Sequence, residues 1–440
     1  MKRLALVLAA LLLVLSYAVP AKADCTNITI GASISVIGYY QTENTDYDTS
    51  NPDSLSGFAE FVDIYLVNTF TDNVRTFIII NLQNPIEDAD KPLLTLDQAY
   101  ITMNEFLNPK VTLEIGFMEW GWELRPTFGA GTMEHIYPYF VNGSFFMNSY
   151  PVGIQVAYAF TDDIKMSLGW GKIIEGSVVG NNANDFDIYF VRYDQKLNES
   201  SKFFAAIVYF NDLGDYYNYY DYATSAWQNL DAQLYNIDAG IDYFLFEEIL
   251  ELYLEFVWQG GDSDAVGVNI GTAALNMGIE YTFDGYDTTP YIGLDFTYIQ
   301  GPDGDTVAFQ PIFQDFTRTL IAENVLFGGL AGWTSTSGGI YTPGYQGIKL
   351  VGGMKSVSND LLAVDFIIGY FMADGDLAPA GRGKGLGWEA DILMSYMYTE
   401  DVTFTVGVGY FKADDDLAEA IGSANPDPVL AGIFSCTIIY

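Results

Sequence analysis

The chain has 440 residues, of which 17% are charged and 16% are aromatic. Globular proteins average about 25% charged residues, so much of this surface is expected to contact something other than water. Acidic residues outnumber basic ones by 57 to 18, for a formal charge of -39. This balance excludes a nucleic-acid binder, which needs a cationic surface.

The first residues have the organisation of a secretory signal peptide. Lys2 and Arg3 form a basic start, an apolar run covers 4–19, and residues 21–23 read Ala-Lys-Ala, an A-x-A cleavage site. We therefore expect residues 1–23 to be removed on export and residues 24–440 to form a single domain. Beyond the signal there is no run of about 18 apolar residues, so no membrane-spanning helix is predicted.

The segments that follow alternate between apolar and polar residues with a period of two, which is the pattern of a β-strand with two different faces. In the clearest segment, 250–259, the even positions are apolar and the odd positions are mostly acids, Tyr and Gln. The segments 391–398 and 403–410 repeat the pattern. One face of each predicted strand is therefore apolar, and the other carries Thr, Ser, Gly and acids.

Short and long connections alternate along the chain. The short ones are polar turns near 71–73, 107–110, 161–163, 195–201, 246–247, 284–289, 358–360 and 399–401. The long ones cover about 41–56, 83–93, 119–150, 173–184, 211–228, 259–267, 301–344, 373–386 and 413–427.

Eight short and nine long connections imply eighteen strands, with sixteen as the alternative count. Short periplasmic turns, long extracellular loops and an even strand number are typical of an all-β fold, the closed antiparallel transmembrane β-barrel. A soluble β-sandwich is the other reading of many short strands. Its outer faces would be polar and its loops would not alternate in length.

One hairpin predicts a register. A two-residue turn at 246–247 would place the apolar residues of both strands on one face. The other face would hold Asp242 opposite Glu251 and Asp238 opposite Glu255, and no base lies on this hairpin. Because like charges side by side need water or cations to screen them, we predict two successive cation stations there.

The end of the chain adds a second signal for the same fold. The residues of one face are Phe434, Cys436, Ile438 and Tyr440, and the chain stops on the aromatic. This resembles the terminal strand of bacterial outer-membrane β-barrel proteins, which closes against the first strand. Residues 94–125 also resemble the hairpin of many porin-like proteins that opens with an Asp-x-Ala-Tyr strand. Those proteins continue with Gly-Arg, where this chain has Gly116-Phe117.

The resemblance to the bacterial porin superfamily covers the whole chain after the signal. It implies a channel for small solutes or cations in the bacterial outer membrane, surrounded by lipid and lipopolysaccharide. It also implies that Tyr440 is part of the signal read by the barrel assembly machinery. The assembly is left open, with a homotrimer as one form, and no nucleic-acid partner is expected.

No catalytic site is expected. Hydrolytic sites need a His beside Ser or Asp for proton transfer, and the only His, His135, has Ser144 nine residues on in the same long connection. Neither a G-x-S-x-G nor an H-E-x-x-H motif occurs. One His and two Cys also exclude haem attachment and zinc ribbons, so we expect a non-enzyme without cofactor or metal.

The alternation predicts which charged residues face the lumen. The acids are Glu114, Asp238, Asp242, Glu251, Glu255, Glu280, Asp295, Asp365, Glu389 and Asp391, and the bases are Arg75, Lys165, Lys349 and Lys355. Anion channels use rings of Arg and Lys, which are scarce here. The set favours a passive diffusion channel that prefers cations. The alternatives are that some of these acids pair with the four bases in a wall network, or that the acidity reflects a saline habitat.

Two long connections are candidates for loops that fold into the pore. Their candidate constriction residues are Arg125, His135, Asp315 and Arg318. A loop as long as 301–344 is usually functional, and within it Asp315 is expected to cap a short helix that continues to Ile321.

Aromatic connections leave two other functions open. Residues 215–227 contain five Tyr and one Trp. Because sugar rings stack on such side chains, a saccharide-selective channel is one alternative. A surface or adhesion barrel without transport, held by its acidic loops, is the other.

The two cysteines suggest a disulfide. Cys25 precedes the first strand, Cys436 lies in the last, and both are placed toward the short-turn rim where those strands must pair. The periplasm permits such bridges because it is oxidising. Cα atoms more than about 7 Å apart would exclude this one.

Overall fold

The structure is a computed structural model of the chain. It describes residues 27–42, 55–84, 93–118, 151–173, 186–212, 218–221, 226–229, 232–263, 270–286, 288–301, 319–322, 344–357, 361–375, 383–420 and 427–439. These ranges are almost entirely β-strand, with one six-residue helix, α3 (Asp415–Ala420), after the second-to-last strand of the barrel. No helix among the described residues is long and apolar enough to cross a membrane.

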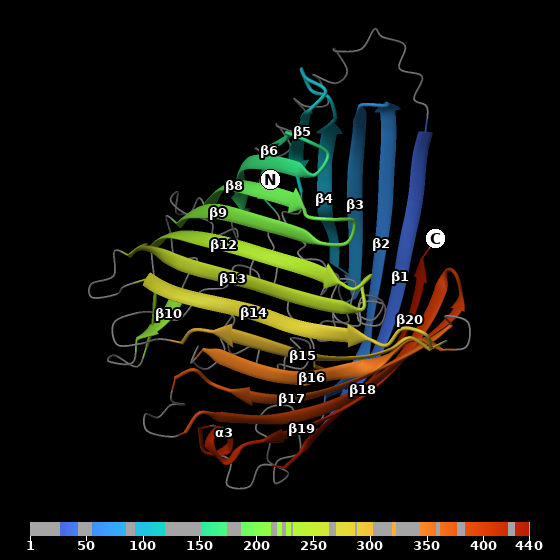
Figure 1. Cartoon of the computed structure of the whole chain (residues 1–440), viewed down its shortest axis with the longest axis vertical. Coiled ribbons are helices and arrows are strands. Elements are labelled where there is room, and N and C mark those ends of the chain that lie inside the picture. The colour runs from blue at the N-terminus through green and yellow to red at the C-terminus, as the bar shows by residue number, and fades with distance from the viewer. Residues whose placement is uncertain are drawn as a thin grey trace.

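Eighteen strands form one antiparallel sheet that closes on itself (Figure 1). They are β1 (Asn27–Gln41), β2 (Leu55–Thr71), β3 (Val74–Asn84), β4 (Leu93–Met103), β5 (Val111–Phe117), β6 (Pro151–Ala159), β7 (Ile164–Ile173), β8 (Phe186–Lys196), β9 (Lys202–Asp212), β12 (Ala232–Leu245), β13 (Leu250–Ser263), β14 (Ile270–Thr282), β15 (Pro290–Ile299), β16 (Tyr345–Val357), β17 (Leu362–Met372), β18 (Gly385–Thr399), β19 (Val402–Ala413) and β20 (Val429–Ile439).

Each strand of the barrel pairs with its neighbours in sequence, and β1 pairs with both β2 and β20, which closes the ring. At the seam Gln41 lies opposite Ala431 and Ser33 opposite Ile439. The predicted eighteen-stranded barrel is confirmed, and the sixteen-stranded count and the soluble sandwich are both wrong. The pattern identifies the strands because each one repeats the same two-faced alternation.

Short and long connections alternate as predicted. Residues 72–73 join β2 to β3 and residues 400–401 join β18 to β19, whereas 42–54 joins β1 to β2. The long connection between β9 and β12 holds a separate hairpin of β10 (Asn218–Asp221) and β11 (Ala226–Asn229).

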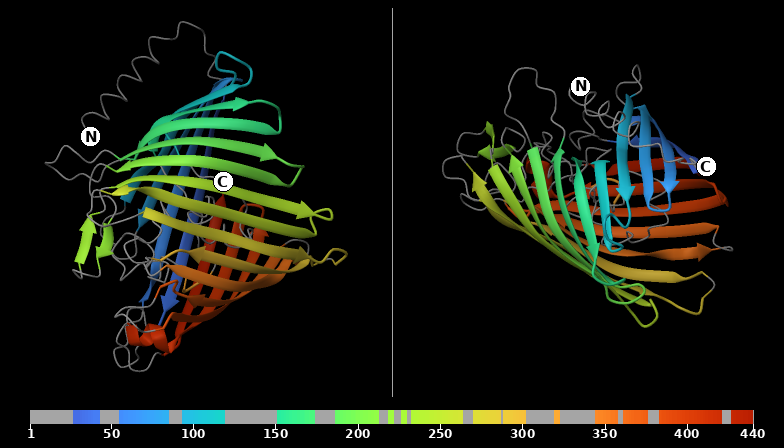
Figure 2. Two further views of the ribbon diagram at one scale, coloured as in Figure 1. Left: turned by 60° about the vertical axis from the view of Figure 1, so that its left-hand side comes forward. Right: turned by 90° about the horizontal axis from the view of Figure 1, so that it is seen from above.

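The barrel wall changes direction around its circumference. In Figure 1, β1–β4 stand upright while the strands from β8 to β17 run across in front of them, and the turned views show the same crossing (Figure 2). Strong tilt is expected when a twisted sheet closes into a barrel. The inner faces of these strands surround the interior that is described below.

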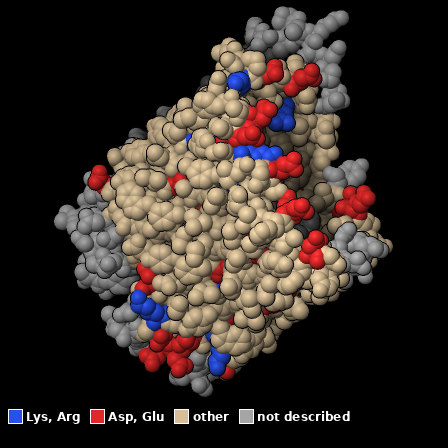
Figure 3. Space-filling view, in the orientation of Figure 1, with Lys and Arg blue, Asp and Glu red and all other residues tan. Residues whose placement is uncertain are grey.

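Side chains alternate between the outside and the interior along each strand. In β13, Leu254 is 39% exposed, whereas its neighbour Glu255 is 2% exposed. The face drawn in Figure 3 is accordingly almost free of charge over the middle of the wall, and most of its Lys, Arg, Asp and Glu lie toward the ends of the strands. An apolar outside and a polar inside is the reverse of a soluble protein and is typical of a barrel that lies in lipid.

The β12–β13 hairpin has a longer turn than the predicted one. Residues 246–249 form a four-residue turn, and its first three residues have positive φ angles of 54°, 57° and 72°. Leu245 therefore lies opposite Leu250. The pairing is shifted by two positions from the predicted register, and a shift of two keeps every side chain on its predicted face.

The shift changes which residues stand directly opposite each other. Asp242 lies opposite Tyr253, not Glu251, and Asp238 lies opposite Val257. The two predicted carboxylate pairs are therefore wrong as direct pairs, although their members share the inner face. The longer turn is the physical reason, because two more residues are used before pairing begins.

The strand register argues against the predicted disulfide. Cys436 is a free thiol and lies opposite Val36. Cys25 lies outside the described residues, but Asn27 follows it closely and lies nine residues from Val36 along β1, roughly 30 Å at about 3.3 Å per residue. The two residues that link Cys25 to Asn27 span at most about 7 Å, too little to bring the two sulfurs together.

Candidate functional site

The inner face of the barrel is lined by carboxylates. The strand alternation places ten there: Glu114, Asp238, Asp242, Glu251, Glu255, Glu280, Asp295, Asp365, Glu389 and Asp391. Glu114 is half-buried, and the other nine are at most 9% exposed. This is the full set of acids that the sequence predicts for the lumen. The structure therefore gathers them on one continuous inner surface.

The four predicted lumen bases are placed unevenly. Arg75 of β3 lies opposite Thr102, and Lys165 of β7 lies opposite Asp194, both near the short-turn ends of their strands and both exposed. Lys349 is completely buried in β16. The side chain of Lys355 lies outside the described residues. Of the three whose side chains are described, only Lys349 reaches the buried part of the acidic wall.

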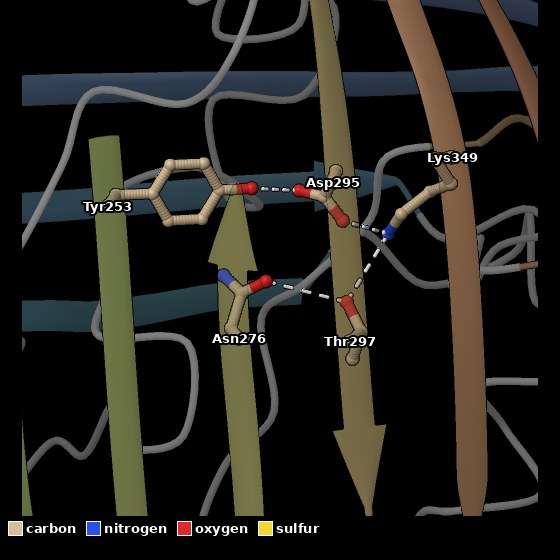
Figure 4. Close-up of polar contacts among 5 residues, drawn as sticks. All are labelled: Tyr253, Asn276, Asp295, Thr297 and Lys349. Atoms are coloured by element: carbon tan, nitrogen blue, oxygen red, sulfur yellow. Dashed lines mark hydrogen bonds and ion pairs between the residues drawn. The ribbon is translucent and has the colours of Figure 1, made fainter. Parts of the chain in front are cut away.

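A row of paired residues crosses the inner wall from β13 to β16 (Figure 4). The Tyr253 hydroxyl donates to Asp295 Oδ2 two strands away, and it passes over Gly278, which is paired with both residues. Lys349 Nζ lies 3.1 Å from Asp295 Oδ1 and 3.5 Å from Thr297 Oγ1. Asp295 is thus held from both sides, by a hydroxyl and by an ammonium group.

The same arrangement recurs one step further around the wall. Tyr291 of β15 is paired with Gly353 of β16, which is paired in turn with Asp365 of β17. The Tyr291 hydroxyl donates to Asp365 Oδ1. In both cases a glycine lies between the tyrosine and the carboxylate, so no side chain stands between them, and the buried carboxylate receives the hydrogen bond that burial requires.

Two cations near the β12–β13 hairpin were missed by sequence reasoning. Lys202 of β9 lies opposite Asp242. Arg192 of β8 lies opposite Ala206, which is also opposite Asp238, and it forms an ion pair of 2.6 Å with Asp194. The hairpin itself carries no base, as the sequence shows, but the neighbouring strands bring two bases close to its carboxylates.

A further carboxylate, Asp63 of β2, was missed as well. It accepts hydrogen bonds from Ser33 Oγ at 3.2 Å and from Asn81 Nδ2 at 2.6 Å, and all three residues are buried. Asp63 alternates with the apolar Val62 and Ile64 in the sequence, which is the signal that could have found it. On the same inner face, Glu114 of β5 accepts a hydrogen bond from Thr102 Oγ1 of β4 at 3.1 Å.

A four-residue piece of the long connection between β15 and β16 lies against this inner wall. We call residues 319–322 the docked segment; all four are buried. Its backbone N–H groups donate to two carboxylates of β18: Leu320 to Asp391 Oδ2 at 3.0 Å, Ile321 to Glu389 Oε1 at 2.6 Å and Ala322 to Glu389 Oε2 at 2.7 Å. Hydrogen bonds to ionised groups are roughly twice as strong as neutral ones.

The docked segment is a series of bends, not a helix. The predicted short helix therefore does not extend to Leu320 and Ile321, because their amides are turned toward the wall instead of toward carbonyls of their own chain. The other constriction candidates, Arg125, His135, Asp315 and Arg318, lie outside the described residues, as does Tyr440.

No protein-family model matches the sequence, and no curated protein matches it. Solved structures match it in fold. Pseudomonas aeruginosa OpdQ has a TM-score of 0.56 at 12% identity, covering 93% of this chain and 97% of that chain. Acinetobacter baumannii OccAB4 has a TM-score of 0.55 at 10% identity, covering 96% and 100%, and P. aeruginosa OccK11 (OpdR) has 0.55 at 10%, covering 93% and 95%. The chain therefore has the fold of the outer-membrane porins, a closed antiparallel barrel of eighteen strands.

Proposed function

We propose that the protein is an outer-membrane channel for the passive diffusion of small hydrophilic solutes, and that it prefers cations. The observation that carries this proposal is the contrast between the two faces of the barrel. The outside is apolar, and on the described inner face carboxylates outnumber Lys and Arg. A closed barrel with an apolar outside and a polar inside can separate the lipid around it from an aqueous route through its interior.

Fixed negative charge inside a barrel selects by sign. Two unit charges about 4 Å apart interact by about 4 kcal/mol at an effective dielectric constant near 20. An excess of lumen carboxylates therefore concentrates cations and depletes anions. The directly opposed acids are Glu251 and Glu280, which makes them the cation station that replaces the two pairs expected from the sequence.

Part of the acidic wall is neutralised. Lys349 pairs with Asp295, Arg192 pairs with Asp194, and Lys202 stands opposite Asp242. The preference for cations is thus expected to be moderate. The docked segment occupies part of the interior, so the proposed route is also narrower than the strand number alone implies.

Planar-bilayer recording tests the proposal. We expect discrete conductance steps, and in a salt gradient a reversal potential of the sign that cation selectivity requires. A trace without steps would favour the surface or adhesion barrel, and a reversal potential set by chloride would contradict the acidic lumen. Conductance blocked by oligosaccharides would favour the saccharide channel, for which the aromatic side chains of residues 215–227 lie outside the described part of the chain.

The same proposal places the protein in the bacterial outer membrane after export. Its partners there are lipid, lipopolysaccharide and the barrel assembly machinery, with Tyr440 as part of the assembly signal. The exposed apolar band supports the lipid contact. Cross-linking of the detergent-extracted protein, followed by mass measurement, distinguishes a homotrimer from a monomer.

A further inference from the structure

The connection that carries the docked segment is closed at its base. A side chain added at Gly344, whose φ is +75°, would lie 2.3 Å from the backbone N of Gly301, so the two ends of the connection touch. Asp374 accepts from Gly301 N at 2.9 Å and from Gln346 Nε2 at 3.0 Å, which holds this neck in place. The connection is thus held at two places. One is this neck, and the other is β18, two strands beyond β16, where the docked segment is bound.

The attachment to β18 is mainly polar. Three backbone N–H groups donate to Glu389 and Asp391, and the Thr319 side chain is hydrogen-bonded to Glu389 as well. Apolar packing adds to these bonds: Leu320, Ile321 and Ala322 are at most 1% exposed, and a side chain added at Gly409 of β19 would lie 3.1 Å from Leu320 Cβ and 3.3 Å from Ile321 Cδ1. The polar part of the attachment therefore depends on two carboxyl groups.

Among the residues that the structure describes, few other charges lie near these two groups. Glu389 and Asp391 are within hydrogen-bonding reach of each other, so proton binding by one affects the other. From β17 the nearest charged residue is Asp365, and from β16 it is Lys349, which is committed to Asp295. The residues of β19 opposite the pair are uncharged, and the docked segment carries no charged side chain.

We propose that the docked segment is a proton-sensitive latch. While the carboxylates are ionised, their oxygens accept the three N–H groups and hold the segment against the wall. Protonation replaces an acceptor by an O–H donor and removes the charge that strengthens the other bonds. The latch is therefore closed while the pair of Glu389 and Asp391 carries negative charge, and it releases the segment into the lumen when a falling pH protonates the pair fully.

Amide hydrogen exchange on the full-length barrel in detergent tests the latch without any assumption about transport. After correction for intrinsic exchange, the amides of Ile321 and Ala322 should exchange at least about tenfold faster once the pH is low enough to protonate the pair, since about 1.4 kcal/mol changes an equilibrium tenfold. The amide of Thr405 in β19 serves as the internal control and should stay protected. Unchanged protection of the two segment amides would overturn the latch.

Variants separate the latch from a general loss of charge. Glu389→Gln should expose the Ile321 and Ala322 amides at neutral pH and remove most of their pH response. Glu255→Gln removes the same charge from the same inner face on β13, five strands away from β18, and it should leave their protection and pH response as in the wild type. Equal effects of the two variants would contradict the latch. If Glu389→Gln does not fold, amide exchange of the wild-type protein as a function of pH still tests the latch.

The consequence for conductance rests on the proposed channel function. In bilayers the wild-type conductance should rise reversibly as the pH falls, and Glu389→Gln should already have the raised level at neutral pH. Exchange that responds to pH in a barrel without conductance steps would uphold the latch and reject the channel. Steps that are present while exchange ignores pH would uphold the channel and reject the latch.

Discussion

The hydroxyl of Tyr253 hydrogen-bonds to the carboxylate of Asp295 across an intervening strand, and it can do so because the residue between them is Gly278. The aromatic ring lies where any side chain of residue 278 would be: a Cβ there would fall 2.4 Å from Tyr253 Cε1. The glycine is therefore part of the polar wall, although it contributes no polar side-chain atom.

Gly278→Ala is expected to destabilise the barrel by about 1–3 kcal/mol, because the ring must move and Asp295 loses a buried donor. Gly271→Ala on the same strand is the matched control, since a Cβ at that position meets nothing within 4 Å; its effect should stay within about 0.5 kcal/mol. Denaturant unfolding in lipid vesicles, followed by tryptophan fluorescence, measures both. Equal stability of the two variants would show that the ring does not need the space.

The ion pair of Lys349 and Asp295 is fully buried, so removing one partner should cost much more than removing both. Lys349→Met leaves a buried carboxylate without its cation and should cost about 3–5 kcal/mol. The double variant Lys349→Met, Asp295→Asn should recover part of that loss. A double-mutant cycle of unfolding free energies gives the coupling, and additive effects would mean that the two groups act independently.

The strand number and the inner set of carboxylates could be predicted because they follow from one local property. In a barrel each side chain faces either lipid or the interior, so alternation in the sequence gives the face directly. Glu251 and Glu255 lie inside for this reason. Even a pairing error of two residues left every side chain of that hairpin on its predicted face.

Other features have no comparable local signal. The turn at 246–249 uses Phe and Glu in the left-handed region, where sequence rules expect Gly, Asn or Asp. Arg192 was missed because two other residues on the inner face of β8, Ile188 and Phe190, are apolar and buried. The inner face of this strand is therefore not marked by polar residues in the sequence. The contact of Ile321 with Glu389 joins residues that are 68 apart in the chain, and it depends on a loop path that no periodicity records.

Charge removal on the β12–β13 hairpin should reduce cation preference. Replacing Asp238, Asp242, Glu251 and Glu255 by Asn and Gln should move the reversal potential toward zero, with the largest shift at low salt, because the Debye length falls to about 3 Å at 1 M. Lys202→Gln should shift it in the opposite direction, since Lys202 stands opposite Asp242. Shifts of the same sign in the two variants would show that these residues do not act through their charge.

Shortening the connection between β15 and β16 should widen the route. Deleting residues 305–340 removes the docked segment, and because Gly301 and Gly344 already lie side by side, the shortened connection can close without moving either strand. Single-channel conductance should rise. The control is deletion of 218–229, the β10–β11 hairpin, which stands outside the ring of barrel strands in Figure 2 and should leave conductance nearly unchanged. An equal conductance for the two deletions would place the constriction elsewhere in the lumen.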